Sequence, residues 1–466
     1  MMIATPTSAL RKCCRCWWLL IGGVVLAVRL AAAPQFVSET DLIDRVVALI
    51  DRRLALMPEV ATVKFQQQQP IADPARENVV LDQSVADAQA MNLDGVAARA
   101  FFSVQIRLAR AVQAHCFERW RTGAEPPPAA RDLVTVLRPA LDAMSRELLP
   151  AVYLASSALA DRPIPALHSQ VARRLRRPGT TEDLLAELTR ALSALRLTAA
   201  PTWATLQRVG VLRVGTTGDY APFSDDRGGE LRGLDIALAQ DLSKAWGVRV
   251  VFVRTSWPTL MDDLGQRRFD LAASGISITP ERQRLADFSA AYLFDGKTPI
   301  ARRADAARFS SLEAIDQPGV RVIVNPGGTN ERFTREKITR ATIVLHPDNR
   351  SIFQEIIAGR ADVMITDGVE VRLQTGRSPE LVGTMAEPFT RAGKAILLSP
   401  GSELTARVDA WLVPPVNRGQ IAERLERALD GGKSDGNSVC AFTRVGSRPG
   451  EQPAGATILR TAAFSQ

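Results

Sequence analysis

The hydrophobic pattern of the chain changes its period near Pro201. Before this point apolar residues recur at helical spacing, and no strand-like alternation is present before residue 210. After it, short runs rich in Val and Ile alternate with helical segments, which is typical of a parallel α/β sheet. The runs cover residues 212–215, 250–253, 269–272, 320–324 and 361–365. At 466 residues the chain is too long for one core, so the sequence predicts a multidomain protein, all-α and then α/β.

The two ends of the chain differ from these domains. Residues 1–33 have a basic start, an apolar stretch over 17–28 and a small-residue exit at 31–33, which predicts a signal peptide and a periplasmic protein. An uncleaved anchor is the alternative. No second apolar run of spanning length follows, so no stable membrane partner is expected. Residues 431–466 are rich in Gly, Ser, Pro and Thr, which predicts a disordered tail.

Charge and reactive side chains exclude several classes of function. The net charge is +8, but the basic residues at the N-terminus supply half of it. The densest basic run, 173–177, has no interleaved aromatic residues, so nucleic-acid binding is not predicted. The three His residues are scattered, and only Cys116 and Cys440 lie beyond the N-terminal segment. We therefore predict no metal site, no disulfide framework and no cofactor.

The helical half, predicted over residues 34–200, carries cations beside or within its apolar stripes. They are Arg53, Lys64, Arg76, Arg110 and Arg146. Gln105, Ala109 and Gln113 are spaced four apart and share one helix face. An arginine on a helix is usually a solvent-exposed surface charge. The spacing of these residues does not by itself show whether they bind a ligand.

Four segments of this half resemble the exported, all-helical chorismate mutases: residues 42–54, 63–65, 70–77 and 101–106. The resemblance implies that Arg53, Arg76 and Arg146 bind the carboxylates of chorismate. It implies that Lys64 and Gln113 donate to the ether oxygen and that Glu77 lies near the ring hydroxyl. Ala109 departs from the family, in which a polar residue is common at this position. Such a Claisen rearrangement needs orientation and donors at the oxygen that gains charge, and no cofactor.

In the second half, polar runs end three of the strand-like segments. Residues 274–282 supply hydroxyls and a guanidinium suited to a carboxylate, and residues 327–331 add more polar groups. Residues 364–370 end in Glu370, which a plain binding cleft for an acid would not favour. An acid inside an anion cleft indicates chemistry on a carboxylated substrate.

Residues 212–223, 233–239 and 274–282 resemble the periplasmic solute-binding proteins for amino acids. The resemblance implies two α/β lobes within residues 205–430, one over about 205–298 and 395–430 and the other over about 299–394. It implies that Ser277 and Arg282 hold a ligand carboxylate, that Thr329 reaches it from the second lobe, and that Asp367 meets the α-amino group.

A narrower resemblance, over residues 205–430, is to cyclohexadienyl dehydratases, which use the solute-binding fold. It is carried by residues 255–258, 296–298, 322–331, 346–349 and 364–370. It implies that Glu370 is the general acid and that Trp257, Lys297 and Asn330 line the cleft. Asp367 suits the ammonium of arogenate but repels the carboxylate of prephenate, so the preference between these substrates stays open.

Together the halves predict a bifunctional exported enzyme that converts chorismate to prephenate and then to phenylpyruvate, and arogenate to phenylalanine if it is accepted. One alternative is a mutase fused to a non-catalytic binding module for an aromatic acid or amino acid. Another is a receptor with an inert helical extension and membrane partners. The sequence leaves the oligomeric state open, including a dimer through the helical domain.

Overall fold

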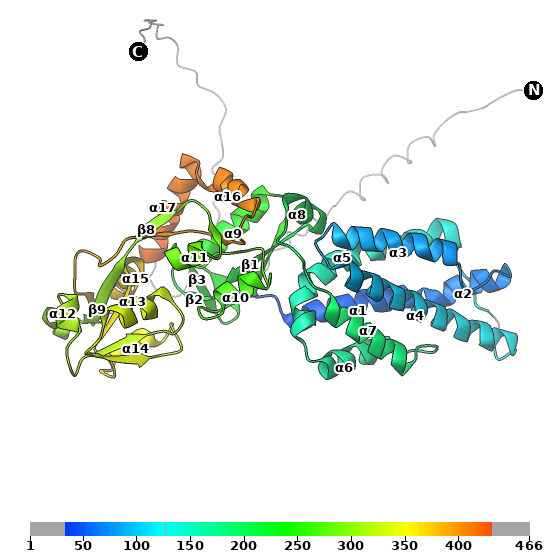
Figure 1. Cartoon of the computed structure of the whole chain (residues 1–466), viewed down its shortest axis with the longest axis horizontal. Helices are drawn as coiled ribbons and strands as arrows, with labels where there is room; N and C mark the ends of the chain where they lie inside the picture. The colour runs from blue at the N-terminus through cyan, green and yellow to red at the C-terminus, as the bar shows by residue number, and fades with distance from the viewer. Residues whose placement is uncertain (1–32, 126, 431–466) are drawn as a thin grey trace, which may run out of the picture.

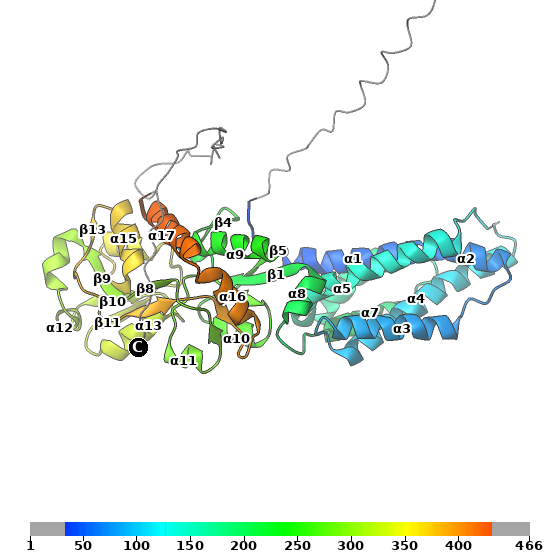
Figure 2. The same ribbon diagram turned by 90° about the horizontal axis from the view of Figure 1, so that it is seen from above.

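The computed structural model describes residues 33–125 and 127–430, and the predicted signal peptide (except Ala33) and tail lie outside them. A helical domain and an α/β domain lie end to end along the long axis of the molecule (Figures 1 and 2). The helical domain, with the linking helix α8, comprises α1 (Glu39–Ala55), α2 (Met57–Gln66), α3 (Pro74–Gln89), α4 (Gly95–Arg121), the π-helical turn η1 (Leu133–Leu137), α5 (Arg138–Asp161), α6 (Ile164–Leu175), α7 (Glu182–Ala194) and α8 (Trp203–Val209).

The helices begin where the sequence supplies a side-chain oxygen to free backbone N–H groups. Ser38, Asp73 and Asp94 each accept a hydrogen bond from the N–H three residues further on, at the starts of α1, α3 and α4. The apolar stripes then pack into one core, in which Ile43 and Phe101 are fully buried. The predicted all-α half is confirmed.

The α/β domain has two lobes, each built on a five-stranded sheet. The first sheet has the order β5-β1-β6-β15-β7 and the second the order β11-β10-β12-β9-β13. In the first, β1 is parallel to β5 and β6; in the second, β10 is parallel to β11 and β12. The strands of the first lobe are β1 (Val211–Thr216), β5 (Arg249–Arg254), β6 (Leu271–Ala272), β7 (Asp287–Phe288) and β15 (Leu397–Leu398); those of the second are β9 (Lys297–Arg302), β10 (Arg321–Val324), β11 (Thr342–Leu345), β12 (Val363–Asp367) and β13 (Leu381–Gly383).

Smaller elements connect and cover these sheets. Strand β8 leads into the second lobe, and its antiparallel partner β14 leads out of it. The chain therefore crosses between the lobes twice, as predicted. Helix α17 packs against α9 of the first lobe and α15 of the second. The remaining elements are β2 (Asp219–Tyr220), β3 (Ser224–Arg227), β4 (Glu230–Arg232), β8 (Leu293–Asp295), β14 (Ala392–Lys394), α9 (Leu234–Ala245), α10 (Leu260–Gly265), α11 (Pro280–Gln283), η2 (Arg303–Arg308), α12 (Leu312–Ile315), α13 (Thr329–Lys337), α14 (Ile352–Ile357), α15 (Gly368–Arg377), α16 (Leu404–Leu412) and α17 (Pro415–Asp430).

The residues just before α1 pair with the first lobe and not with the helical bundle. Val37 N donates to Phe252 O at 2.9 Å, and Phe36 forms a parallel bridge with Phe252 at the open edge of β5. Pro34 O accepts a backbone hydrogen bond from β4 at 2.7 Å, and the guanidinium of Arg254 lies 3.8 Å from the centre of the Phe36 ring. The predicted helical domain over 34–200 therefore begins with a segment that pairs with the edge of the sheet in the other domain.

A buried polar cluster joins the two domains. Tyr153 of α5 donates its hydroxyl to Asp270 Oδ1 at 2.9 Å, and the guanidinium of Arg213, in β1, binds the same carboxylate at 2.6 Å. The guanidinium of Arg213 lies 4.5 Å from the centre of the Tyr153 ring, and all three residues are at most 1% exposed. Since a buried carboxylate needs every donor it has, the helical domain contributes directly to the stability of the first lobe.

Replacing Tyr153 with phenylalanine should lower the free energy of unfolding by roughly 1–3 kcal/mol, because Asp270 loses a donor that water cannot replace. Urea unfolding followed by tryptophan fluorescence measures this. Ser157→Ala, at a partly buried position on the same helix, should stay within about 0.5 kcal/mol of the parent. Equal stability of the two variants would show that the cluster does not couple the domains.

None of the helices in the described ranges combines the length and the apolar character needed to cross a membrane.

Candidate active sites

A cavity of about 570 Å³ lies in the helical domain between α1, α2, α3, α4 and the start of α5. Its cationic lining residues are Arg53, Lys64, Arg76, Arg110 and Arg138. Its acidic lining residues are Asp73, Glu77 and Asp142. The surplus of cations suits a ligand with more than one carboxylate.

Two of these cations are held in place by the protein. Arg53 donates to Ser145 Oγ at 2.6 Å, and burial lowers the pKa of its guanidinium to about 10, against the opposing charge of Asp142. Lys64 donates to Ile71 O at 2.7 Å. Burial lowers the pKa of Lys64 below its usual value, although nearby carboxylates oppose the change. Both groups are therefore partly desolvated cations at a fixed position, which strengthens their interaction with an anion.

The helix face predicted on α4 also lines the cavity. Gln113 donates to Ala109 O at 3.2 Å, and its Oε1 is buried without a partner. Gln105 has a buried Nε2 without a partner, so it brings an unused donor to the cavity wall. Glu77 forms an ion pair with Arg110, whose Nε lies 2.9 Å from Glu77 Oε1.

Arg146 lies outside this cavity, in contrast to the prediction. It lines a neighbouring cavity of about 550 Å³, together with Arg76. On α5 the positions of Arg138, Leu141 and Ser145 share the face turned to the first cavity, and residue 146 lies one step further round the helix. Arg138, which was not predicted, lines the first cavity instead.

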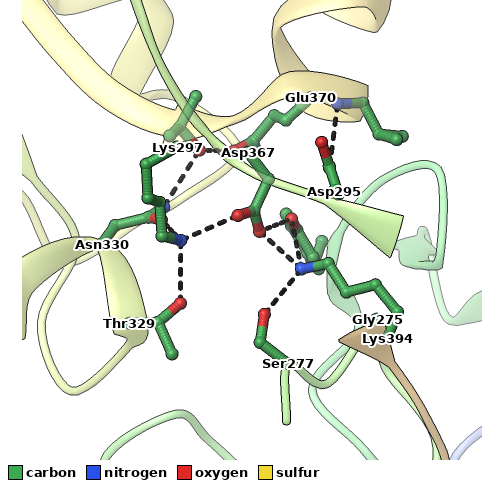
Figure 3. A network of polar contacts seen from close by, with 12 residues as sticks. Gly275, Ser277, Asp295, Lys297, Thr329, Asn330, Asp367, Glu370 and Lys394 are labelled. Atoms are coloured by element: carbon green, nitrogen blue, oxygen red, sulfur yellow. Dashed lines mark hydrogen bonds and ion pairs between the residues drawn. The ribbon is translucent and has the colours of Figure 1, made fainter. Parts of the chain in front are cut away.

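The cleft between the lobes of the α/β domain centres on Asp367, at the end of β12 (Figure 3). Lys297 Nζ lies 2.8 Å from Asp367 Oδ1, and Lys394 Nζ lies 2.6 Å from Oδ2. The hydroxyl of Tyr220, from the first lobe, also donates to Oδ2. Burial alone would raise the pKa of Asp367, but the two lysine ammoniums hold that pKa well below its usual range.

Glu370 lies one turn further on, at the start of α15, and is 2% exposed. Its carboxyl accepts a hydrogen bond from Thr366 Oγ1, and Asn349 Nδ2 lies 3.4 Å from Oε1. Burial raises the pKa of Glu370 to about 8, and the charge of Asp367 adds to this effect. Glu370 is therefore protonated near neutral pH, in contrast to Asp367 three residues before it.

Other predicted residues surround the same cleft, in which the closed lobes leave about 20 Å³ of space. They are Trp257, Ser277, Arg282, Thr329 and Asn330. Arg282 donates to Ser277 O at 3.1 Å, and burial lowers the pKa of its guanidinium to about 10. Lys297 and Glu370 do not line the remaining space, but they touch residues that do. The three polar runs of the sequence thus meet in one place.

Two further residues of the cleft, Lys394 and Tyr220, were not predicted. Lys394 ends β14, the strand that leaves the second lobe, and both its side chain and that of Tyr220 are buried. Tyr220 lies within residues 212–223, which carry the resemblance to the solute-binding proteins, but no role was predicted for it, and no motif marks Lys394. Within residues 33–125 and 127–430, no group of three or more His, Cys, Asp and Glu side chains is placed to hold a metal ion.

Comparison with known proteins gives relatives for both halves. Residues 37–114 match chorismate mutase type II, and residues 212–437 match the bacterial extracellular solute-binding proteins, family 3. The cyclohexadienyl dehydratase of Pseudomonas aeruginosa is 51% identical over 224 residues, which cover 47% of this chain and 83% of that protein. The histidine-binding periplasmic protein of Escherichia coli K12 is 33% identical over 162 residues, which cover 34% of this chain and 61% of that protein.

Among solved structures, an ancestral amino-acid-binding protein described as a precursor of cyclohexadienyl dehydratase is similar to 48% of this chain. The match covers 98% of that structure, with 33% identity and a TM-score of 0.45. The sequence relationship to the Pseudomonas aeruginosa enzyme spans nearly the whole α/β domain. The chain therefore belongs to the cyclohexadienyl dehydratase family and carries a chorismate mutase type II domain in front of that region.

Proposed function

We propose that this chain is an exported bifunctional enzyme that converts chorismate to prephenate in its helical domain and prephenate to phenylpyruvate in its α/β domain. The observation that carries the proposal is Glu370, a carboxyl group with a pKa of about 8 directly behind an anion cleft. A plain receptor for a carboxylated ligand has no use for such an acid, whereas a dehydratase needs one. The product of the first reaction is the substrate of the second.

The mutase step depends on orientation and on charge. Chorismate must fold its side chain over its ring, so that a C–C bond forms as the ether C–O bond breaks. We assign the two carboxylates to Arg53, Arg76 and Arg138, with Arg138 in the role first predicted for Arg146. The ether oxygen gains negative charge in the transition state, and Lys64 and Gln113 are the proposed donors to it.

Glu77 is the proposed partner of the ring hydroxyl of chorismate. Its ion pair with Arg110 fixes the carboxylate at the cavity wall. Ala109, on the same wall, supplies no polar group where related mutases often have one. The buried and unpartnered Nε2 of Gln105, one turn away, is a donor that can act in its place.

The dehydratase step needs one proton. Glu370 is the proposed general acid, and its proton joins the departing ring hydroxyl to form water. The electron pair of the bond to the ring carboxylate then completes the aromatic ring, and that carboxylate leaves as CO2. Ser277, Arg282 and Thr329 are the proposed contacts of the pyruvyl carboxylate, while Trp257 and Asn330 complete the cleft wall.

We place the protein in the periplasm. The family that matches residues 212–437 is described as extracellular, and residues 1–33 have the pattern of a signal peptide. A location outside the cytoplasm requires chorismate to reach the same compartment.

The first test supplies chorismate to the full chain and follows chorismate and phenylpyruvate together. The proposal predicts that chorismate disappears and phenylpyruvate forms. Prephenate that accumulates without conversion would instead identify the α/β domain as a binding module, and no loss of chorismate would refute the mutase assignment.

Dehydratase activity should fall as the pH rises through about 8, because Glu370 loses the proton that it must donate. The kcat for phenylpyruvate formation from prephenate, measured between about pH 6 and pH 10, gives this profile. A kcat that stays level to the alkaline end of the range would refute Glu370 as the acid.

A further inference from the structure

The cavity that contains Arg146 has no part in the proposed reactions. It adjoins the mutase cavity, and residues of α3 and α5 line both spaces: Arg76, Val80, Asp142 and Ser145. These shared residues form the boundary between the two cavities. At the rim of the second space Val79, Arg146 and Arg208 are exposed, so we call it the outer cavity.

The boundary between the cavities is a contact of two helices that no polar interaction closes. On α3, Glu77 and Asp82 pair with arginines of α4, and Asp87 pairs with an arginine of α8. On α5, Ser145 and Glu147 bind arginines of α1. Among the described residues, no hydrogen bond or ion pair joins α3 to α5. The two helices can therefore move apart without losing a polar contact.

The outer cavity has two guanidinium groups that the protein does not neutralise. Arg208 lies 3.8 Å from Asp87, and Asp142 faces a cation of the mutase cavity. Within the described part of the chain, the side chains of Arg76 and Arg146 form no hydrogen bond and no ion pair. Because Arg76 lines both cavities, these two cations lead from the exposed rim to the mutase site.

The floor of the outer cavity is apolar. Met91, Phe102 and Leu149 form it, and none of them is more than 5% exposed. A ligand that suits both the floor and the rim combines a ring with more than one carboxylate. Chorismate has this chemistry, since its ring and its enolpyruvyl side chain each carry a carboxylate. The proposed substrate of the mutase cavity therefore also fits the space beside it.

We propose that the outer cavity is a docking site for the chorismate dianion and that the gap between α3 and α5 is the entrance to the mutase site. This inference rests on the proposed mutase function. Arg146 attracts the dianion to the outer cavity, and Arg76 receives one of its carboxylates at the gap. Arg146 thus acts on the capture of substrate and not on the rearrangement.

Replacing Arg146 with methionine in the full chain should lower kcat/KM for chorismate about fivefold and leave kcat within about twofold. The change removes a charge that attracts the dianion but no contact of the transition state. The loss should shrink when NaCl is raised from about 20 mM to about 300 mM, because salt screens exposed charges. Arg190→Met is the matched control, exposed on α7 and outside both cavities, and it should change neither constant by more than about twofold.

A bulky side chain tests the entrance without changing the charge. Val79 is 59% exposed and lines the outer cavity but not the mutase cavity, so Val79→Trp should obstruct the approach alone. Its kcat/KM should fall by the same factor at both salt concentrations, because salt does not screen a steric barrier. Val96→Trp, at a position that is 83% exposed and outside both cavities, should leave kcat/KM within about twofold of the parent.

Distinct results separate the failure of this inference from the failure of the proposed function. A parent that consumes no chorismate would overturn the mutase itself. With an active parent, an unchanged kcat/KM in either Arg146→Met or Val79→Trp would overturn the docking site. A kcat in Arg146→Met that falls as far as kcat/KM would place Arg146 at the transition state, and would equally contradict a role in capture.

Discussion

Replacing Glu370 with glutamine should lower the rate of phenylpyruvate formation from prephenate by roughly 10²–10⁴-fold, the usual contribution of a general acid. Glutamine has nearly the same shape and can keep contacts with Thr366 and Asn349, but its amide has no proton to give to a departing hydroxyl. The fold should survive, because the native carboxyl is already neutral at pH 7. Prephenate turnover at saturating substrate measures the effect.

Two controls make this result specific. Glu336→Gln, at an exposed position on α13 in the same lobe, should leave the dehydratase rate unchanged within about twofold. In Glu370→Gln itself, chorismate should still be consumed and prephenate should accumulate. A Glu370→Gln variant with full dehydratase activity would mean that another group, or water, supplies the proton.

Replacing Lys64 with methionine should lower the mutase rate by roughly 10²–10³-fold, as the loss of one preorganised donor to a developing oxyanion does. The methionine side chain fills similar space but offers no charge and no hydrogen bond. Chorismate consumption measures the change. Dehydration of added prephenate by the same preparation should continue at the parent rate, since Lys64 lies in the other domain.

Arg45→Met is the matched control for Lys64→Met. Arg45 lies on α1, the helix that also carries Arg53, but it is exposed and does not line the cavity. Its replacement should leave the mutase rate within about twofold of the parent. Equal losses in the two variants would indicate a general electrostatic effect of the domain and no specific donor at Lys64.

The sequence predicted the features that depend on local pattern. Apolar residues at helical spacing determine α1 and α4. Runs of Val and Ile determine β1 and β10, and the polar residues after such strands meet in the cleft because parallel strands end at one edge of a sheet. Glu370 was recognisable because it stands in one of these polar runs, directly after the strand β12.

The features that the sequence did not reveal depend on contacts between distant segments. Lys394 reaches Asp367 only because β14 returns beside β8, and nothing in its own neighbourhood indicates that path. Arg138 and Arg146 lie on one helix, and only the rotation of α5 against α1 decides which of them faces the cavity. The sequence around Tyr153 indicates only a core residue of the helical domain. Its hydrogen bond to Asp270, in the other domain, is visible only in the structure.

The pairing of Phe36 and Val37 with β5 has a consequence for the order in which the molecule folds. The segment that covers this sheet edge is made first, but its partner strand emerges only after the whole helical domain. Contacts of this length are slow to form from an open chain. Helices α1 to α7 can fold as a unit during synthesis, and a folded unit holds its first residues near its last ones. If the helical domain folds first, residues 36 and 37 are already held in place when β5 becomes available for pairing.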